Sequence, residues 1–445
     1  MSTSSTDEHD LSTKPGASDV LETSNVSSQV DVEKHGPSAV SAASPPSASP
    51  GLPPPPNGGL QAWLQVIGGF LFVLNTWGMA NTFVISWVGS IQGFLLLFVG
   101  VFAGRAFDAG YFYPVAGLGV FLSVFGMMMT SLATEYYQVF LAQGLCLGLG
   151  SGCLFTPGIS LVGTYFSTRR GLATGIAASG SSVGGIIFPV VIRRLIVTVG
   201  FPWAVRAMTI IMLGTLAIGI SILRPRLPPR KSGPVIDFAA FKDPAYTTFV
   251  IGLALGFMAF FIPFFYAESY ALNIGVESEL SFYILSIMNA AGMIGRLLPN
   301  ALADKIGSLS VIVPCSYISA IVVLAWISAK SLGTLLATSI MYSFFSGGLM
   351  ALPPAVLVAL SPSLNQIEVR VGMALTIGSL GVLIGSPIAG AILSGQSRSN
   401  HTDGTQNGGL EYTGTLIITG VALLVCGGFM NGTRVIKKGV KLGKV

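Results

Sequence analysis

Long apolar stretches recur along most of the chain, from Trp63 to Thr433, and only short polar segments separate them. A helix that crosses a bilayer needs roughly 20 consecutive, mostly apolar residues, which is the length scale of these stretches. Charged residues make up 9% of the 445 positions, whereas a soluble domain carries about 25%. Because so few charges cannot cover a water-exposed surface, the sequence predicts an all-α membrane protein and excludes two soluble domains.

The apolar stretches predict twelve membrane spans in two sets of six. The first set covers residues 61–81, 84–103, 115–133, 139–162, 172–199 and 203–223. The second set covers residues 248–271, 282–302, 308–329, 332–360, 371–393 and 413–433. We therefore expect two six-helix halves, residues 57–223 and 246–434, joined by a cytosolic linker at 224–245. Residues 81–84 alone connect the first two spans, which predicts a shortened connection between helix 1 and helix 2.

Both ends of the chain are polar. Residues 1–56 are rich in Ser, Thr, Pro and acidic residues, which predicts a disordered tail. Residues 435–445 form a short basic tail. With the N-terminus inside, the predicted cytosolic side of the membrane part carries 16 Lys and Arg residues, and the other side carries five. This excess favours both termini in the cytosol, in the plasma membrane or, as an alternative, in a vacuolar or other internal membrane.

The predicted spans lack the residues that several kinds of chemistry need. All three histidines, His9, His35 and His401, lie outside the predicted spans, and the spans contain no clustered carboxylates. The phosphate-binding pattern of ATP-driven pumps is also absent from the sequence. We therefore expect no metal site, no cofactor, no enzymatic activity and no nucleic-acid partner. The expected partners are the lipid bilayer and a small-molecule substrate, with protons as a candidate coupling ion.

A turn with glycine, arginine, aspartate and glycine occurs once in each half. Residues 104–110 contain Arg105 and Asp108, and residues 295–307 contain Asp304 and Lys305. Opposite charges at helix ends can pair in one access state of a transporter and separate in the other, which makes these residues candidate gating groups. The alternative is that they reach the membrane interface beside a tight glycine turn.

A second candidate gating segment enters the fifth span. Arg169 and Arg170 lie at the predicted cytosolic boundary, and small residues follow them at roughly helical spacing up to Gly185. Small residues allow two helix backbones to approach closely. This pattern fits a helix that rocks against its neighbours, and it fits tight static packing equally well.

These motifs resemble those of a known family. The two glycine–arginine–aspartate turns are similar to the signature loops of the major facilitator superfamily. Residues 57–63, 165–175 and 263–270 resemble segments of its monocarboxylate-transporter branch, especially of fungal members, although Asn57 stands where that branch usually has an acid. The resemblance extends from about residue 57 to the end of the last span. It implies a major-facilitator-type bundle of twelve helices and a secondary transporter.

The resemblance also implies roles for charged residues. Arg296 matches a helix 8 arginine that contacts the substrate carboxylate in monocarboxylate transporters, with a purely structural salt bridge as the alternative. Glu268 is a second candidate, or a residue of the cavity rim. In the animal relatives, proton coupling involves an aspartate one turn before that arginine and a lysine in helix 1. Gly292 occupies the aspartate position here and the first span has no lysine, so proton-coupled lactate transport does not carry over.

Neutral polar residues in the spans are further candidates for the wall of a cavity. They are Asn75, Asn81, Asn289, Tyr283 and Tyr342. Such residues suit a larger and less charged solute, and they also serve as hydrogen-bonding links between helices. The predicted substrate is a small organic anion or a fungal secondary metabolite that is exported. The alternatives are a transporter-like membrane sensor or scaffold and a transport-impaired truncated copy.

We expect a glycan at Asn400. Residues Asn400-His401-Thr402 form an N-x-S/T acceptor in a loop predicted to lie outside the cytosol, whereas the acceptors at Asn25 and Asn431 face the cytosol. Glycosidase treatment should increase the mobility of the purified protein on a gel, and Asn400→Gln should show the same mobility without treatment. A mobility that glycosidase leaves unchanged would reject the site.

Overall fold

The computed structural model describes residues 55–82, 86–229, 237–362, 364–402 and 411–438, and within these ranges the regular structure is helical throughout. The all-α prediction is confirmed. Nearly all of the predicted tail at 1–56, and residues 439–445 of the basic tail, lie outside the described ranges. The described residues belong to one compact unit, Pro53–Val445.

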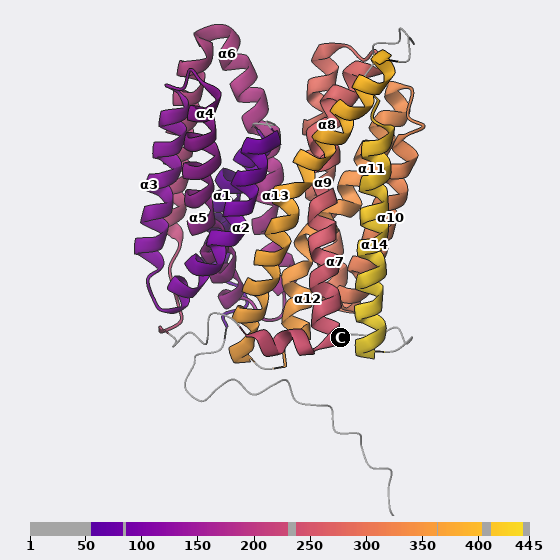
Figure 1. Cartoon of the computed structure of the whole chain (residues 1–445). Coiled ribbons are helices and arrows are strands. Elements are labelled where there is room, and N and C mark those ends of the chain that lie inside the picture. Colours follow the sequence, from indigo (N-terminus) through magenta and orange to yellow (C-terminus); the bar gives the residue numbers. More distant parts are fainter. Residues whose placement is uncertain (1–54, 83–85, 230–236, 363, 403–410, 439–445) are drawn as a thin grey trace, which may run out of the picture. The chain divides into compact units, whose positions relative to one another are not determined.

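The helices follow the predicted spans in order (Figure 1). The first group is α1 (Leu60–Ala80), α2 (Ser86–Asp108), α3 (Phe112–Thr130), α4 (Tyr136–Val139), the π-helix η1 (Phe140–Leu147), α5 (Gly148–Tyr165) and α6 (Arg170–Ile222). The second group begins with the 3-10 helix η2 (Phe238–Lys242), α7 (Pro244–Phe260), α8 (Ile262–Asn273), α9 (Ser278–Ile306) and α10 (Ser308–Trp326). It ends with α11 (Leu332–Ala351), α12 (Pro353–Leu360), α13 (Leu364–Thr402) and α14 (Thr413–Lys438).

Helix α6 has 53 residues, more than twice what one crossing needs. It bends at Gly200, whose φ of 76° lies in the left-handed region that glycine adopts readily. Gly180 packs against the Phe70 carbonyl, and Gly219, 39 positions later, packs against the Phe72 ring. A straight helix would separate the two glycines by about 58 Å. Helix α6 therefore turns back along α1, and the 11 long apolar helices of the described ranges cover twelve predicted spans.

Proline interrupts two predicted spans in the second half of the chain, those at residues 248–271 and 332–360. Helix α7 ends at Phe260 and α8 begins at Ile262, with Pro263 in the first turn of α8. In the same way, α11 ends at Ala351 and α12 begins at Pro353. Proline has no backbone N–H to donate and its ring crowds the preceding turn, so the helical hydrogen-bond ladder is broken at both points.

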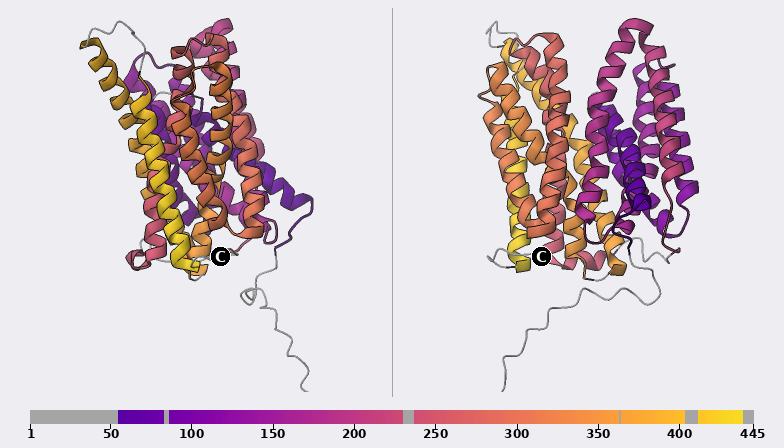
Figure 2. Two further views of the ribbon diagram at one scale, coloured as in Figure 1. Left: turned by 90° about the vertical axis from the view of Figure 1, so that its right-hand side faces the viewer. Right: turned by 180° about the vertical axis from the view of Figure 1, so that it is seen from behind.

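The buried apolar side chains form two clusters. The N-terminal cluster is built from residues between Ala62 and Leu223. The C-terminal cluster is built mainly from residues between Ala240 and Met430, and a few side chains of α1 and α2 join it. In Figures 1 and 2 the indigo-to-magenta helices lie beside the orange-to-yellow ones. The two groups meet where α2 packs on α13 and where α6 packs on α9.

The α6–α9 interface depends on small residues in α6. A β-carbon added to Gly171 would lie 2.5 Å from the Asp304 carboxylate, and one added to Gly185 would lie 2.6 Å from the Asn289 amide oxygen. Further along, the Arg193 guanidinium lies 4.3 Å from the centre of the Phe282 ring. As the residue numbers rise along α6, the numbers of the contacted residues in α9 fall, so the two helices are antiparallel. Contact extends over about 33 Å of helix, comparable to the ~30 Å hydrocarbon core of a bilayer.

The corner between α1 and α2 is short, as expected. Helix α1 ends at Ala80 and α2 begins at Ser86, while residues 83–85 lie outside the described ranges. Helix α1 has 21 residues, whereas the α7–α8 pair extends over 30 residues from Pro244 to Asn273. Helix α1 is therefore shorter than the α7–α8 pair by most of the length of α8.

The loop predicted before the last span is partly helical. Helix α13 continues to Thr402, nine residues beyond the predicted end at 393, so the prediction of a loop is wrong for residues 394–402. The hydropathy pattern marks the end of the apolar stretch, but the polar residues that follow continue the helix. The backbone of Asn400 belongs to α13, and its side chain lies outside the described part of the structure.

The close packing of α6 on α1 predicts different effects for two glycine substitutions in α6. Gly180→Ala places a methyl group against the backbone carbonyl of Phe70, which no side-chain rotation can relieve. Overpacking of this kind costs about 1–3 kcal/mol, so the melting temperature of the purified protein should fall by several degrees. Gly214→Ala is the matched control, because no atom lies within 4 Å of the added carbon. Equal melting temperatures for the two variants would contradict the packing.

Candidate functional site

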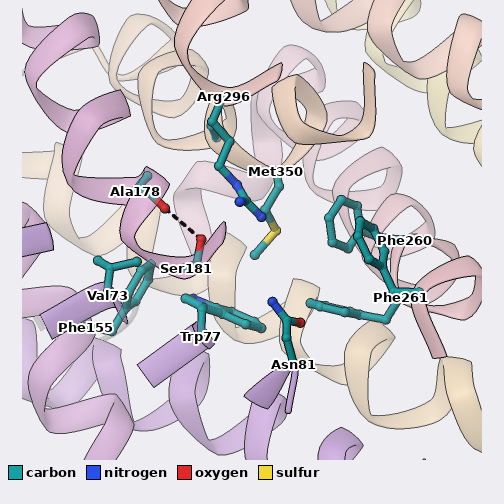
Figure 3. Close-up of a pocket in the computed structure, with 12 residues that line it drawn as sticks. Val73, Trp77, Asn81, Phe155, Ala178, Ser181, Phe260, Phe261, Arg296 and Met350 are labelled. Carbon is teal, nitrogen blue, oxygen red and sulfur yellow. Dashed lines mark hydrogen bonds between the residues drawn. The ribbon is translucent and has the colours of Figure 1, made fainter. Parts of the chain in front are cut away.

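A cavity opens between the two clusters (Figure 3). It contains about 510 Å³ of empty space, counted with its open mouth. Side chains from α1, α5, α6, α9 and α11 and from the α7–α8 break line it. They are Val73, Trp77, Asn81, Phe155, Ala178, Ser181, Phe260, Phe261, Phe264, Arg296, Met350 and Ala351. Both proline-associated helix breaks therefore border the cavity.

Arg296 is the charged residue of the cavity wall, and its side chain points into the cavity in Figure 3. The residue is 7% exposed, and its Nη1 donates a hydrogen bond to the Ser182 hydroxyl in α6. No carboxylate of the described ranges forms an ion pair with it. A buried charge is costly unless it is paired, so this guanidinium is suited to receive an anion.

The backbone around Arg296 is held by glycine. Gly295 packs against the Phe344 carbonyl in α11, and Gly175 in α6 faces the Arg296 carbonyl. The Asn300 amide donates to that same carbonyl at 2.7 Å. Helix α9 is thereby fixed between α6 and α11, and the position of the guanidinium follows from this packing.

Aromatic rings form much of the remaining wall. The Trp77 and Phe261 rings are nearly parallel, with an interplanar angle of 11° and centroids 5.4 Å apart. Phe155 meets Trp77 edge-on at 6.1 Å, and Phe260 meets Phe261 edge-on at 4.8 Å. Trp77 comes from α1 and Phe261 from the α7–α8 break, so the parallel pair joins elements from the two halves of the chain.

Two polar groups beside these rings have no partner within the described part of the chain. The Trp77 indole N–H is buried and meets no acceptor there. Asn81, the C-cap of α1, is 8% exposed, and its amide takes part in none of the side-chain hydrogen bonds found among described residues. The cavity thus combines one cation, several aromatic faces and two uncommitted neutral polar groups.

Three other candidate residues bond to neighbouring helices instead of lining this cavity. The Tyr342 hydroxyl donates to the Phe260 carbonyl at 2.7 Å and so supports an aromatic residue of the wall. The Asn75 amide donates to the Thr215 hydroxyl in α6 at 2.9 Å. The Asn289 amide donates to the Gly185 carbonyl in α6 at 3.4 Å and to the Leu285 carbonyl of its own helix at 2.9 Å.

The remaining candidates lie away from the cavity. Glu268 in α8 and Tyr283 in α9 are half-buried. Arg105 and Asp108 are half-buried in the last turns of α2, and Arg169, Asp304 and Lys305 are exposed, Arg169 at the start of α6 and the other two near the end of α9. Arg170 lies against Gly163 in α5, and the Asp304 carboxylate lies against Gly171. Of the gating candidates, Asp304 therefore bridges α9 and α6.

The aromatic residues of the wall were not among the candidates selected from the sequence. A signal was present, because Phe260, Phe261 and Phe264 form a dense aromatic run around a proline, and Trp77 follows two polar residues within an apolar span. Aromatic residues are frequent in membrane helices, so the run does not by itself indicate a cavity. The break before Pro263 and the packing between halves bring these rings together.

Known proteins resemble the chain over most of its length. The model of the Major Facilitator Superfamily matches residues 60–334. The MFS-type transporter dbaD of Emericella nidulans is 42% identical over 406 residues, which cover 87% of this chain and 89% of the relative. The Aspyridones efflux protein apdF of the same fungus is 35% identical over 368 residues, covering 78% of this chain and 75% of the relative.

Solved structures share the fold at low sequence identity. The fucose:proton symporter FucP of E. coli has a TM-score of 0.62 at 15% identity, covering 84% of this chain and 98% of that one. The human organic anion transporter MFSD10 has the same TM-score at 13% identity, covering 84% of this chain and 100% of that one. The family match, the relatives and the fold agree, and the chain belongs to the major facilitator superfamily.

Proposed function

We propose that this chain exports a small organic anion of fungal secondary metabolism through the cavity between its two halves. The observation that carries the proposal is Arg296, a buried cation in the cavity wall with no carboxylate partner among the described residues. Two relatives support the direction of transport, since they are named efflux proteins for aspyridones and agnestins. The second of these, from Paecilomyces divaricatus, is 34% identical over 382 residues.

The arrangement of the halves supports transport by rocking. A solute held at Arg296 lies beside the α6–α9 interface, and major-facilitator carriers expose a midplane site alternately to either side of the membrane. In this proposal both termini face the cytosol, the membrane is the plasma membrane, and protons are the candidate coupling ion. In this proposal Asn75, Asn289 and Tyr342 hold the helices around the cavity, and Glu268 and Tyr283 act away from the anion.

Substitutions of Arg296 should show whether the residue acts in anion binding or in fold stability. Arg296→Gln should weaken anion binding about 10- to 100-fold, because a hydrogen bond to a charged group contributes roughly 1.5–3 kcal/mol. Arg296→Lys keeps the charge without the bidentate geometry and should retain part of the affinity. Uptake of labelled organic acids and fungal culture metabolites into inverted proteoliposomes measures the effect, with the exposed Lys330→Gln as control.

The melting temperature of the same variants tests the structural alternative. Removing a buried, unpaired cation should leave the melting temperature of Arg296→Gln unchanged or higher. A marked fall, together with unchanged transport, would show that Arg296 only supports the fold. Folded wild-type protein that moves none of the tested acids or metabolites would reject the transport proposal itself.

The contact between Asp304 and Gly171 is the proposed gate between α9 and α6. The carboxylate lies at the N-terminal end of α6, where the helix dipole stabilises a negative charge by about 0.3–1 kcal/mol. Asp304→Asn should therefore lower the transport rate by roughly two- to fivefold and change equilibrium anion binding less than twofold. Lys305→Gln is the neighbouring control. Equal transport rates in wild type and Asp304→Asn would remove Asp304 from the gate.

A further inference from the structure

The Asn81 amide is a buried polar group of the cavity wall that the fold does not use. Asn81 is the C-cap of α1, but it is the backbone N–H that bonds the Trp77 carbonyl, so the side chain takes no part in the cap. The residue is 8% exposed, and its amide forms no hydrogen bond among the described residues. An amide carries both a donor and an acceptor, and burying them without partners costs free energy. A solute in the cavity is therefore a suitable partner.

The other neutral polar groups beside the cavity are less available. The Ser181 hydroxyl donates to the Ala178 carbonyl at 2.7 Å, so its proton is already committed. The Trp77 indole nitrogen is fully enclosed by the protein, so a solute does not reach it. Among the described residues of the wall, Asn81 thus has the one amide side chain, and both its donor and its acceptor are uncommitted.

The amide and the cation of the site face one another. In Figure 3 the Asn81 and Arg296 side chains point into the cavity from opposite sides, and the Met350 side chain extends into the space between them. Apolar side chains such as Val73 and Phe155 form much of the wall. A solute that spans the cavity therefore meets a cation at one end, apolar groups along its middle and an amide at the other end.

We propose that the solute is a two-ended monoanion, with its carboxylate at Arg296, an apolar middle, and a hydroxyl or carbonyl oxygen at Asn81. This inference rests on the proposed function and names the substrate class of that site. A solute without the distal oxygen covers the amide and leaves its polar atoms without partners, which weakens binding. Arg296 alone would accept both kinds of anion.

The positions of the two groups link this preference to transport. Asn81 ends α1 in the first half of the chain, and Arg296 belongs to α9 in the second half. A solute that bonds both residues therefore connects the two halves through its own length. The separation of its two polar ends then affects the relative position of the halves as well as the affinity.

Positional isomers of hydroxy acids provide the test. Each ω-hydroxycarboxylate of about six to twelve carbons is compared with its 3-hydroxy isomer, which has the same atoms and charge but carries the hydroxyl near the carboxylate. Calorimetric titration of the full chain in lipid nanodiscs gives both dissociation constants, with empty nanodiscs as background. The constant of the 3-hydroxy isomer divided by that of the ω isomer is the distal preference. We expect a distal preference of about tenfold in wild type at one chain length, the factor that one neutral hydrogen bond provides.

Three variants locate the second contact. Asn81→Leu keeps nearly the same side-chain size and should reduce the distal preference about tenfold. Asn81→Gln keeps the amide on a side chain longer by one methylene group, so the preferred acid should be about one carbon shorter. Asn431→Leu, on α14 and outside the cavity wall, is the matched control and should leave the preference unchanged. Because both isomers are measured on the same sample, partial misfolding does not alter the ratio.

The outcomes distinguish this inference from the proposed function. If wild type binds the two isomers equally at every length and Arg296→Gln weakens both, the site binds anions without a second contact, and the inference is wrong. A distal preference that Asn81→Leu leaves unchanged would also overturn it, as would an unshifted optimum length in Asn81→Gln. If Arg296→Gln weakens neither isomer, the proposed anion site itself fails.

Discussion

The antiparallel packing of α6 on α9 is the contact on which the rest of the structure depends. Glycines at positions 171, 175 and 185 allow the two backbones to approach along a length comparable to the membrane core. In a bilayer the lipid tails are as apolar as the helix surfaces, so close packing between small residues provides much of the attraction. The interface also joins the two halves of the chain, and it presents Arg296 to the cavity.

A second constraint comes from the two proline-associated breaks. Residues 260, 261 and 264 lie within an arc of about 100° around the helix axis, which is one face of a helix. All three border the cavity where α7 ends and α8 begins. Irregular backbone at membrane depth is tolerated where it lines a cavity or is buried in protein. The same backbone feature that weakens the helix therefore shapes the site.

Much of the fold could be predicted from the sequence, because span length and charge are local properties. The lengths of the apolar stretches and the polar segments between them predict twelve spans. They also predict the short α1–α2 connection and the break near residue 200. They do not predict the α13 extension past residue 393, because polar residues there remain helical. In the site, Arg296 was a candidate because the family resemblance matches it to an arginine that contacts substrate. The pairing of Trp77 with Phe261 depends on how the two halves pack, which no local pattern encodes.

The short α1–α2 corner also changes how the molecule meets the lipid around it. A helix of 21 residues reaches about 31 Å, barely the thickness of the hydrocarbon core, whereas the α7–α8 pair reaches about 45 Å over its 30 residues. Bilayers adjust to such differences by thinning locally beside the shorter element. Asn81 caps α1 and also lines the cavity. Asn81 therefore marks a point where the end of a short span and the wall of the cavity coincide.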